Sequence, residues 1–354
     1  MPRSLPHLDI AVWRSDPSRF ARQLRLACHH DGFLQLRHRI PTPLVEHVKS
    51  EARNFFAQDA EHKHAIDYRG SPAFRGYMAC GVENTAGRPD LREQVEIAAE
   101  GELAAADAWP AYHRLCGPNQ WPPGQPSLQP AIGEYTQHML QVSSELTHAL
   151  CAALGLEQTA LDGWFAPTPH WQLKLASYRP STDAGGSAAA EAPEAPVGVG
   201  AHTDSGFLTM LLQDEAGGLE AFTRGEWAPV PPLGPEWVVV NLGEVAEVAS
   251  GGYLLATPHR VLSTPATRLS VPFFYNPSLE TVVEPLALPS SLAWERDAAY
   301  DSQTHWRRPA NAMLREYGLN AFKSLARSHP AVFAAHHPDL LVEEDGQVVR
   351  RSAA

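Results

Sequence analysis

The hydrophobic pattern changes near Gly163, and this change limits the folds that the chain can adopt. Before it, apolar residues recur mainly at helical spacing. From there to about Glu284, apolar and polar residues alternate in short runs, which is typical of β-strands. Many antiparallel strands with flanking helices predict a mainly β protein with a jelly-roll core, the double-stranded β-helix. Strands are expected at residues 173–178, twice within 199–213, and at 237–242, 253–256 and 269–275.

The first half of the chain predicts the flanking helices. A short strand is expected over residues 5–12, and helices are expected to begin at Asp16-Pro17 and Thr42-Pro43, where a capping side chain precedes a proline. Residues 57–126 are rich in Gly, Pro and aromatic residues and are expected to wrap the core irregularly. An apolar stripe over 128–154 predicts a long supporting helix.

These patterns divide the chain into three expected parts. Residues 1–160 form an N-terminal, mainly helical region, 161–290 form the jelly-roll core, and 291–354 form a C-terminal extension that is helical over 304–336. Within the core, the Ser/Ala/Gly/Glu/Pro tract at 181–197 cannot bury apolar surface and is expected to be a flexible insertion.

Charge and cysteine content bear on partners and compartment. The net charge is −12 and no long run of Lys or Arg occurs, so neither nucleic acid nor an anionic membrane is expected as a partner. The opening residues Met-Pro-Arg-Ser-Leu-Pro-His lack the apolar core of a signal peptide, and no apolar run approaches membrane-spanning length. The four cysteines are widely spaced, which favours free thiols in a reducing compartment. We therefore expect a soluble, cytoplasmic protein.

Two candidate metal ligands, His202 and Asp204, lie two residues apart at the start of the 199–213 segment. In a strand, such residues face the same way, so the two side chains would point together and leave Thr203 on the other face. The pattern alone is weak. Three further His-x-Asp pairs are expected on a strand face, at a helix end and at the surface: His7/Asp9, His29/Asp31 and His337/Asp339.

His259 supplies a third candidate ligand, 55 positions after Asp204, although a hydrogen-bonded strand histidine is the alternative. Two histidines and one carboxylate with open coordination positions suit non-haem Fe(II). Arg268-Leu-Ser270 then places a guanidinium and a hydroxyl on one strand face, where they can hold a carboxylate. Tyr178 can add a second hydroxyl, and packing in the barrel wall explains it equally well. Candidate pocket walls, for which core packing is at least as good an explanation, are Phe207, Leu219, Asn241 and Phe274.

This order of motifs within β-patterned sequence resembles the 2-oxoglutarate/Fe(II)-dependent dioxygenases, in the branch that includes isopenicillin N synthase. The resemblance covers residues 6–285. It implies an enzyme that hydroxylates or otherwise oxidises a small organic substrate, with formation of succinate and CO₂, as a monomer or weak oligomer. The implied cofactors are Fe(II), 2-oxoglutarate and O₂, with ascorbate as a further candidate. The implied metal ligands are His202, Asp204 and His259, and the implied 2-oxoglutarate contacts are Arg268, Ser270 and Tyr178.

Some features depart from that family or leave alternatives open. Ala176 stands where the family often has Asn, and a one-residue slip would bring Arg179 rather than Tyr178 to the cosubstrate. An iron oxidase that works without 2-oxoglutarate, as isopenicillin N synthase does, has the same motifs. A non-catalytic jelly-roll binding protein is a further alternative, whereas Arg-x-Ser gives no support to a zinc hydrolase. The sequence does not predict the prime substrate.

Overall fold

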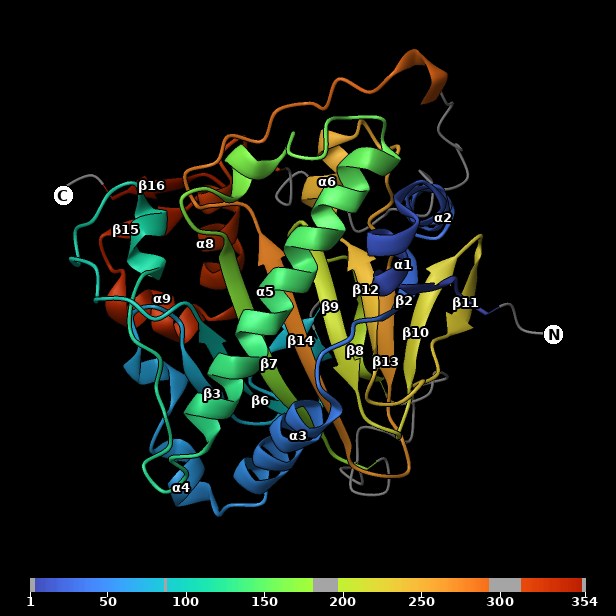
Figure 1. The fold of residues 1–354 in the computed structure, drawn as a ribbon. Helices are drawn as coiled ribbons and strands as arrows, with labels where there is room; N and C mark the ends of the chain where they lie inside the picture. The colour runs from blue at the N-terminus through green and yellow to red at the C-terminus, as the bar shows by residue number, and fades with distance from the viewer. Residues whose placement is uncertain (1–3, 86–87, 181–196, 293–312, 352–354) are drawn as a thin grey trace.

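The computed structural model describes residues 4–85, 88–180, 197–292 and 313–351, which fold into two main sheets covered by helices (Figure 1). The larger sheet contains, in spatial order, β1 (His7–Asp9), β2 (Phe33–Arg37), β12 (Trp237–Leu242), β9 (Leu208–Gln213), β14 (Arg268–Asn276), β7 (His170–Tyr178), β6 (Arg92–Ala98) and β3 (Gly76–Met78). The smaller sheet contains β11 (Glu226–Pro229), β10 (Leu219–Thr223), β13 (His259–Leu262) and β8 (Val197–His202). Two further two-stranded sheets pair β4 (Asn84–Thr85) with β5 (Arg88–Pro89) and β15 (Leu340–Val342) with β16 (Val348–Arg350).

Helices cover the outer face of the larger sheet, and the longest, α5, runs across it (Figure 1). The α-helices in the described residues are α1 (Ile10–Ser15), α2 (Pro17–His30), α3 (Thr42–Phe56), α4 (Ala60–His64), α5 (Leu128–Ala153), α6 (Glu244–Ala249), α8 (Tyr317–Ser328) and α9 (Pro330–His336). Short 3₁₀ turns lie at η1 (Tyr68–Gly70), η2 (Ala111–Leu115), η3 (Asp162–Phe165) and η6 (Ser290–Leu292). In this part of the chain, no helix is both long and apolar enough to span a membrane.

The alternation of side chains along the strands produces two separate hydrophobic clusters. On β7, Leu173 and Leu175 point outward and join the larger cluster beneath the helices, whereas Ala176 and Tyr178 point inward. The inner cluster combines residues of both main sheets, such as Val239 of β12 with residues of β10 and β13. The predicted jelly-roll core with flanking helices is therefore confirmed, and its interior is the space between the two sheets.

Two predicted boundaries of secondary-structure elements in the N-terminal region were wrong. The strand expected over 5–12 ends at Asp9, because the Asp9 carboxylate accepts the backbone N–H of Ala11 at 3.0 Å and caps α1. Asp16 caps α2 as expected, through the N–H of Arg19. Thr42 does not cap α3, because it is already the first helical residue and Pro41 precedes it without a side-chain bond.

Two segments were assigned the wrong secondary structure. Residues 57–126 do not merely wrap the core, because they supply β3 and β6 to the larger sheet. The alternation in β6 is hidden in the sequence because its inward positions are polar. Residues 253–256 were expected to form a strand but form an irregular link, in which Leu255 donates its N–H to the carbonyl of Cys28 at 3.2 Å.

Burial also corrects two polar residues that were expected to be solvated. His337 is 2% exposed, stacks on Phe74 with ring centroids 5.3 Å apart, and contacts the carbonyl of Pro72. Asp31 is buried at the end of α2, where Arg224 pairs with it at 2.9 Å. The flexible insertion expected at 181–197 lies outside the described residues except for Val197, as does the 304–312 part of the predicted C-terminal helix. The three-part division of the chain stays a prediction.

Candidate active site

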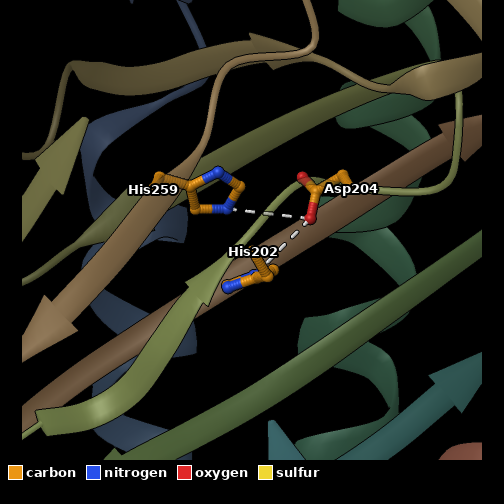
Figure 2. Close-up of side chains that lie close together, drawn as sticks. All are labelled: His202, Asp204 and His259. Carbon is orange, nitrogen blue, oxygen red and sulfur yellow. Dashed lines mark ion pairs between the residues drawn. The ribbon is translucent and has the colours of Figure 1, made fainter. Parts of the chain in front are cut away.

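Three potential metal ligands come together at one end of the space between the sheets (Figure 2). His202 is the last residue of β8 and pairs in register with His259, the first residue of β13. Asp204 lies just beyond β8, and one ligand atom from each residue falls within 4.8 Å of the others. Asp204 Oδ1 lies 3.8 Å from His202 Nε2 and 3.7 Å from His259 Nε2.

The convergence of His202 and Asp204 was predicted, but the strand alternation proposed for it is wrong. Because β8 ends at His202, Asp204 belongs to the loop that leads into β9. The larger sheet holds its carboxylate: Thr209 Oγ1 donates to Oδ2 at 2.5 Å, and Asn241 Nδ2 donates to the same oxygen at 2.7 Å. Both donors therefore occupy Oδ2 and leave Oδ1 directed toward the two imidazoles.

Backbone carbonyls orient both imidazoles. His202 Nδ1 lies 2.8 Å from the carbonyl oxygen of Gly200, and His259 Nδ1 lies 3.1 Å from that of Thr257. A carbonyl oxygen only accepts, so each Nδ1 carries the hydrogen and each Nε2 presents a lone pair. Burial, followed by the nearby His259, lowers the pKa of His202 to about 4, so this imidazole is neutral near pH 7.

The Asp204 carboxylate is ionised despite its burial. Burial raises its pKa, but His259, His202 and the hydrogen bonds from Thr209 and Asn241 lower it more, and the net shift is downward. Two imidazoles and one carboxylate form a donor set for a divalent cation with open coordination positions. The His202 side chain is 33% exposed, so one side of the cluster is open to solvent.

Arg268 points into the space between the sheets from β14 of the larger sheet and carries unused hydrogen-bond donors. It is 1% exposed, and its Nε donates to the carbonyl of Gly217 at 2.7 Å, which fixes the guanidinium. Its Nη1 and Nη2 atoms are buried and have no hydrogen-bond partner among the described residues. A buried, charged fork without an acceptor is costly, so the site suits a ligand that brings a carboxylate.

Ser270 and Tyr178 lie beside Arg268. Ser270 is two residues along β14 and buried, and the Arg268 guanidinium carbon lies 4.6 Å from the centroid of the Tyr178 ring. Tyr178 points into the barrel beside Arg268, whereas Arg179 is exposed. Burial alone would raise the pKa of Tyr178, but Arg92 and Arg268 lower it more, so the net shift is downward.

Other residues at the site were missed or misjudged from sequence. Asn241 is not simply a pocket wall, because it holds Asp204. Phe207 belongs to the outer cluster, where its ring centroid lies 5.4 Å from that of Phe165. Thr209 was missed, although a lone hydroxyl in the apolar run 207–212 was a usable signal. Arg92 was missed because its segment was not recognised as a strand.

Two family models match separate stretches of the chain. Residues 5–124 match the model for the non-haem dioxygenase in morphine synthesis N-terminal region, and residues 172–277 match that of the 2OG-Fe(II) oxygenase superfamily. The second range contains all three candidate metal ligands and the Arg268-Leu-Ser270 motif.

Curated relatives and solved structures agree with these matches. The 2-oxoglutarate-dependent dioxygenase frbJ of Dothideomycetidae sp. (strain 11243) is 33% identical over 83% of this chain and 80% of its own. Homoarginine-6-hydroxylase 2-ODD-C23 of Glycine max is 30% identical over 80% of this chain and 88% of its own. Neurospora crassa T7H, solved in complex with alpha-KG and thymine, has the same fold, with a TM-score of 0.71 at 22% identity over 92% of this chain and 97% of its own.

Proposed function

The chain belongs to the 2-oxoglutarate/Fe(II)-dependent oxygenase superfamily, and from this premise we propose which residues carry its reaction. It is an enzyme that uses Fe(II) and 2-oxoglutarate to oxidise a small organic substrate, with formation of succinate and CO₂.

His202, Asp204 and His259 are the proposed Fe(II) ligands. Two neutral imidazoles and a carboxylate on one side of a metal are the donor set that non-haem Fe(II) oxygenases use. The hydrogen bonds from Thr209 and Asn241 to Oδ2 support binding through Oδ1 alone. A metal held by these three atoms would keep coordination positions for a cosubstrate and O₂.

Arg268, Ser270 and Tyr178 are the proposed contacts of the distal carboxylate of 2-oxoglutarate. The observation that supports this most is the pair of buried Arg268 nitrogens without an acceptor, because a carboxylate fits their fork with two parallel hydrogen bonds. Ser270 and Tyr178 place two hydroxyl groups beside that fork.

When bound, Fe(II) and 2-oxoglutarate supply the oxidising chemistry, which consumes O₂ and leaves the substrate hydroxylated or otherwise oxidised. The residues of the chain position the reactants. Arg268 would hold the far carboxylate of the cosubstrate, which would leave its keto acid end for the three ligands. The apolar inner cluster around Val239 and Tyr178 keeps bulk water away from this interior.

The reaction is tested by measuring succinate. The purified protein is incubated with Fe(II), 2-oxoglutarate and O₂, with L-homoarginine as the first substrate because several relatives are named homoarginine-6-hydroxylases. We expect succinate from the parent protein and none from His202→Ala, with the substrate product identified by mass spectrometry. Substrate oxidation without succinate would contradict the proposal and indicate an oxidase that works without 2-oxoglutarate.

Further properties are proposed from the composition of the chain and from the resemblance to the family. We place the enzyme in the cytoplasm and in the isopenicillin N synthase-like branch, as a monomer or weak oligomer that does not bind nucleic acid or membranes. The free state of Cys28, Cys80, Cys116 and Cys151 supports a reducing compartment. The net charge of −12 argues against polyanionic partners. Ascorbate is proposed as a further cofactor only by resemblance.

A further inference from the structure

Arg92 of β6 extends the row of residues proposed to hold 2-oxoglutarate. In the strand register, Tyr178 of β7 pairs with Arg268 of β14 on one side and with Arg92 on the other. All three side chains lie on the interior wall. Arg92 Nη1 donates to the Tyr178 hydroxyl oxygen at 3.5 Å, on the side of Tyr178 opposite β14. The hydroxyl of Tyr178 is therefore reached by a cation from the N-terminal half of the chain.

The direction of this hydrogen bond determines what Tyr178 can do. A guanidinium has no acceptor, so in the bond with Arg92 the phenolic oxygen must accept. Ser270 also hydrogen-bonds Tyr178 and lowers its pKa, so the phenolic oxygen accepts there too. The single hydrogen of Tyr178 is then left for an acceptor other than these two residues. The neighbouring cations lower the pKa of Tyr178, which makes its hydroxyl a stronger donor. On the wall beside Arg268, the acceptor that such a donor suits is a carboxylate.

Arg92 is itself fixed by two carboxylates of the preceding segment. It forms an ion pair with Glu83 and a second one with Asp90 at 3.4 Å, and Lys174 also holds Glu83, at 3.2 Å. The side chains of Arg92 and Glu83 are only 13% and 12% exposed, so the geometry is constrained by burial. The two ion pairs and the burial therefore fix the guanidinium, with its Nη1 held toward the Tyr178 hydroxyl.

We propose that Arg92 is a positioning residue for 2-oxoglutarate, because by donating to Tyr178 it directs the phenolic hydrogen toward the carboxylate that Arg268 holds. The inference rests on the proposed roles of Arg268, Ser270 and Tyr178. It couples the affinity for the cosubstrate to β6, a strand outside the part of the chain that carries the metal ligands.

The test is a double-mutant cycle on the binding of 2-oxoglutarate. Fe(II)-loaded protein is titrated with 2-oxoglutarate under anaerobic conditions, and the visible charge-transfer band of the chelate is followed. We expect Tyr178→Phe to raise the dissociation constant about tenfold and Arg92→Gln about fivefold, the range of an ordinary intramolecular hydrogen bond. In the Tyr178→Phe background, Arg92→Gln should have no further effect, because the hydrogen that Arg92 directs is absent.

Two additional variants keep the test decisive. Arg92→Lys retains the charge between Glu83 and Asp90, so it folds even if Arg92→Gln does not, and its loss of affinity should also vanish in the Tyr178→Phe background. Arg179→Gln changes the exposed neighbour of Tyr178 and should leave the dissociation constant within about twofold of the parent. In turnover, the Arg92 variants should raise KM for 2-oxoglutarate and leave kcat at saturation nearly unchanged.

The outcomes separate this inference from the proposed function. If the parent forms the band and the two losses multiply, or if folded Arg92 variants bind like the parent, the inference is wrong and the 2-oxoglutarate site stands. If the parent binds iron and forms no band at any concentration of 2-oxoglutarate, the proposed function itself fails.

Discussion

Asn241 donates a hydrogen bond of 2.7 Å to Asp204 Oδ2, and this bond joins the two sheets at the metal site. Asn241 lies on β12 of the larger sheet, whereas Asp204 follows β8 of the smaller one. Thr209 of β9 donates to the same oxygen. The larger sheet thus positions a ligand that the smaller sheet presents next to its two histidines.

Loss of this support should weaken iron binding without unfolding the protein. Asn241→Ala removes one of two donors to Oδ2, so the carboxylate loses its orientation and Fe(II) affinity should fall about tenfold. Isothermal titration with Fe(II) under anaerobic conditions measures this. Asn54→Ala, at an exposed position of α3, is the control and should bind iron like the parent. Unchanged affinity in folded Asn241→Ala would contradict the positioning role.

Gly243 permits the close approach of the loop that carries Asp204. A Cβ atom on Gly243 would overlap the carbonyl oxygen of Gly206 and lie 2.8 Å from that of Asp204. Gly243→Ala should therefore displace the loop, destabilise the fold by about 1–3 kcal/mol and weaken Fe(II) binding. Urea denaturation and iron titration measure the two effects. Gly225→Ala, where a Cβ would meet no neighbour within 4 Å, controls for the substitution itself, although its positive φ adds some strain.

The shape of the Arg268 side chain should matter as well as its charge. Arg268→Lys keeps the cation but loses the two-pronged fork, so the dissociation constant of 2-oxoglutarate should rise at least about tenfold. Arg260→Lys, in a partly buried ion pair with Glu220 on the smaller sheet, is the matched control and should bind 2-oxoglutarate normally. Equal affinity of the parent and Arg268→Lys would show that the fork does not hold the cosubstrate.

Acid should destabilise the fold through His38, away from the active site. Burial is the main cause that lowers the pKa of His38 to about 4, while the unfolded chain takes up the same proton near pH 6.5. As the pH falls, the unfolded state gains the proton first, so the folded state loses stability between pH 6.5 and 4. Between pH 7 and 5 this contributes a loss of about 2 kcal/mol.

Urea denaturation of the parent and His38→Gln at both pH values checks this prediction. The variant should lose about 2 kcal/mol less than the parent between pH 7 and 5. The same loss in both proteins would show that His38 is not the group responsible.

Much of the fold follows from local patterns in the sequence. The apolar run of residues 237–242 and the apolar stripe of 128–154 reappear as β12 and α5, because the strand is buried on both faces and the helix buries one stripe. Those patterns fail where polar residues face the interior. β6 presents Arg92, Gln94 and Glu96 to the barrel, so the face of this strand that points into the interior is polar. Because a buried face is expected to be apolar, the segment was interpreted as irregular chain wrapping the core.

The ligand types could be predicted, but the contacts that position them could not. His202, Asp204 and His259 were identified by their order, and the three side chains do converge. The hydrogen bond from Asn241 depends on the pairing of β12 with β9. β12 is distant in sequence from the loop that carries Asp204. Contacts between distant strands depend on register, and single-sequence patterns do not define it.

The central claim is that His202, Asp204 and His259 bind Fe(II) and that Arg268 holds 2-oxoglutarate beside it. Anaerobic titration of the protein with Fe(II) and 2-oxoglutarate, followed by visible absorption, tests this most directly. The account predicts a charge-transfer band in the parent, no band with His202→Ala, and a much higher requirement for 2-oxoglutarate with Arg268→Ala. A parent protein that binds iron without forming the band, or a band that persists in His202→Ala, would contradict it.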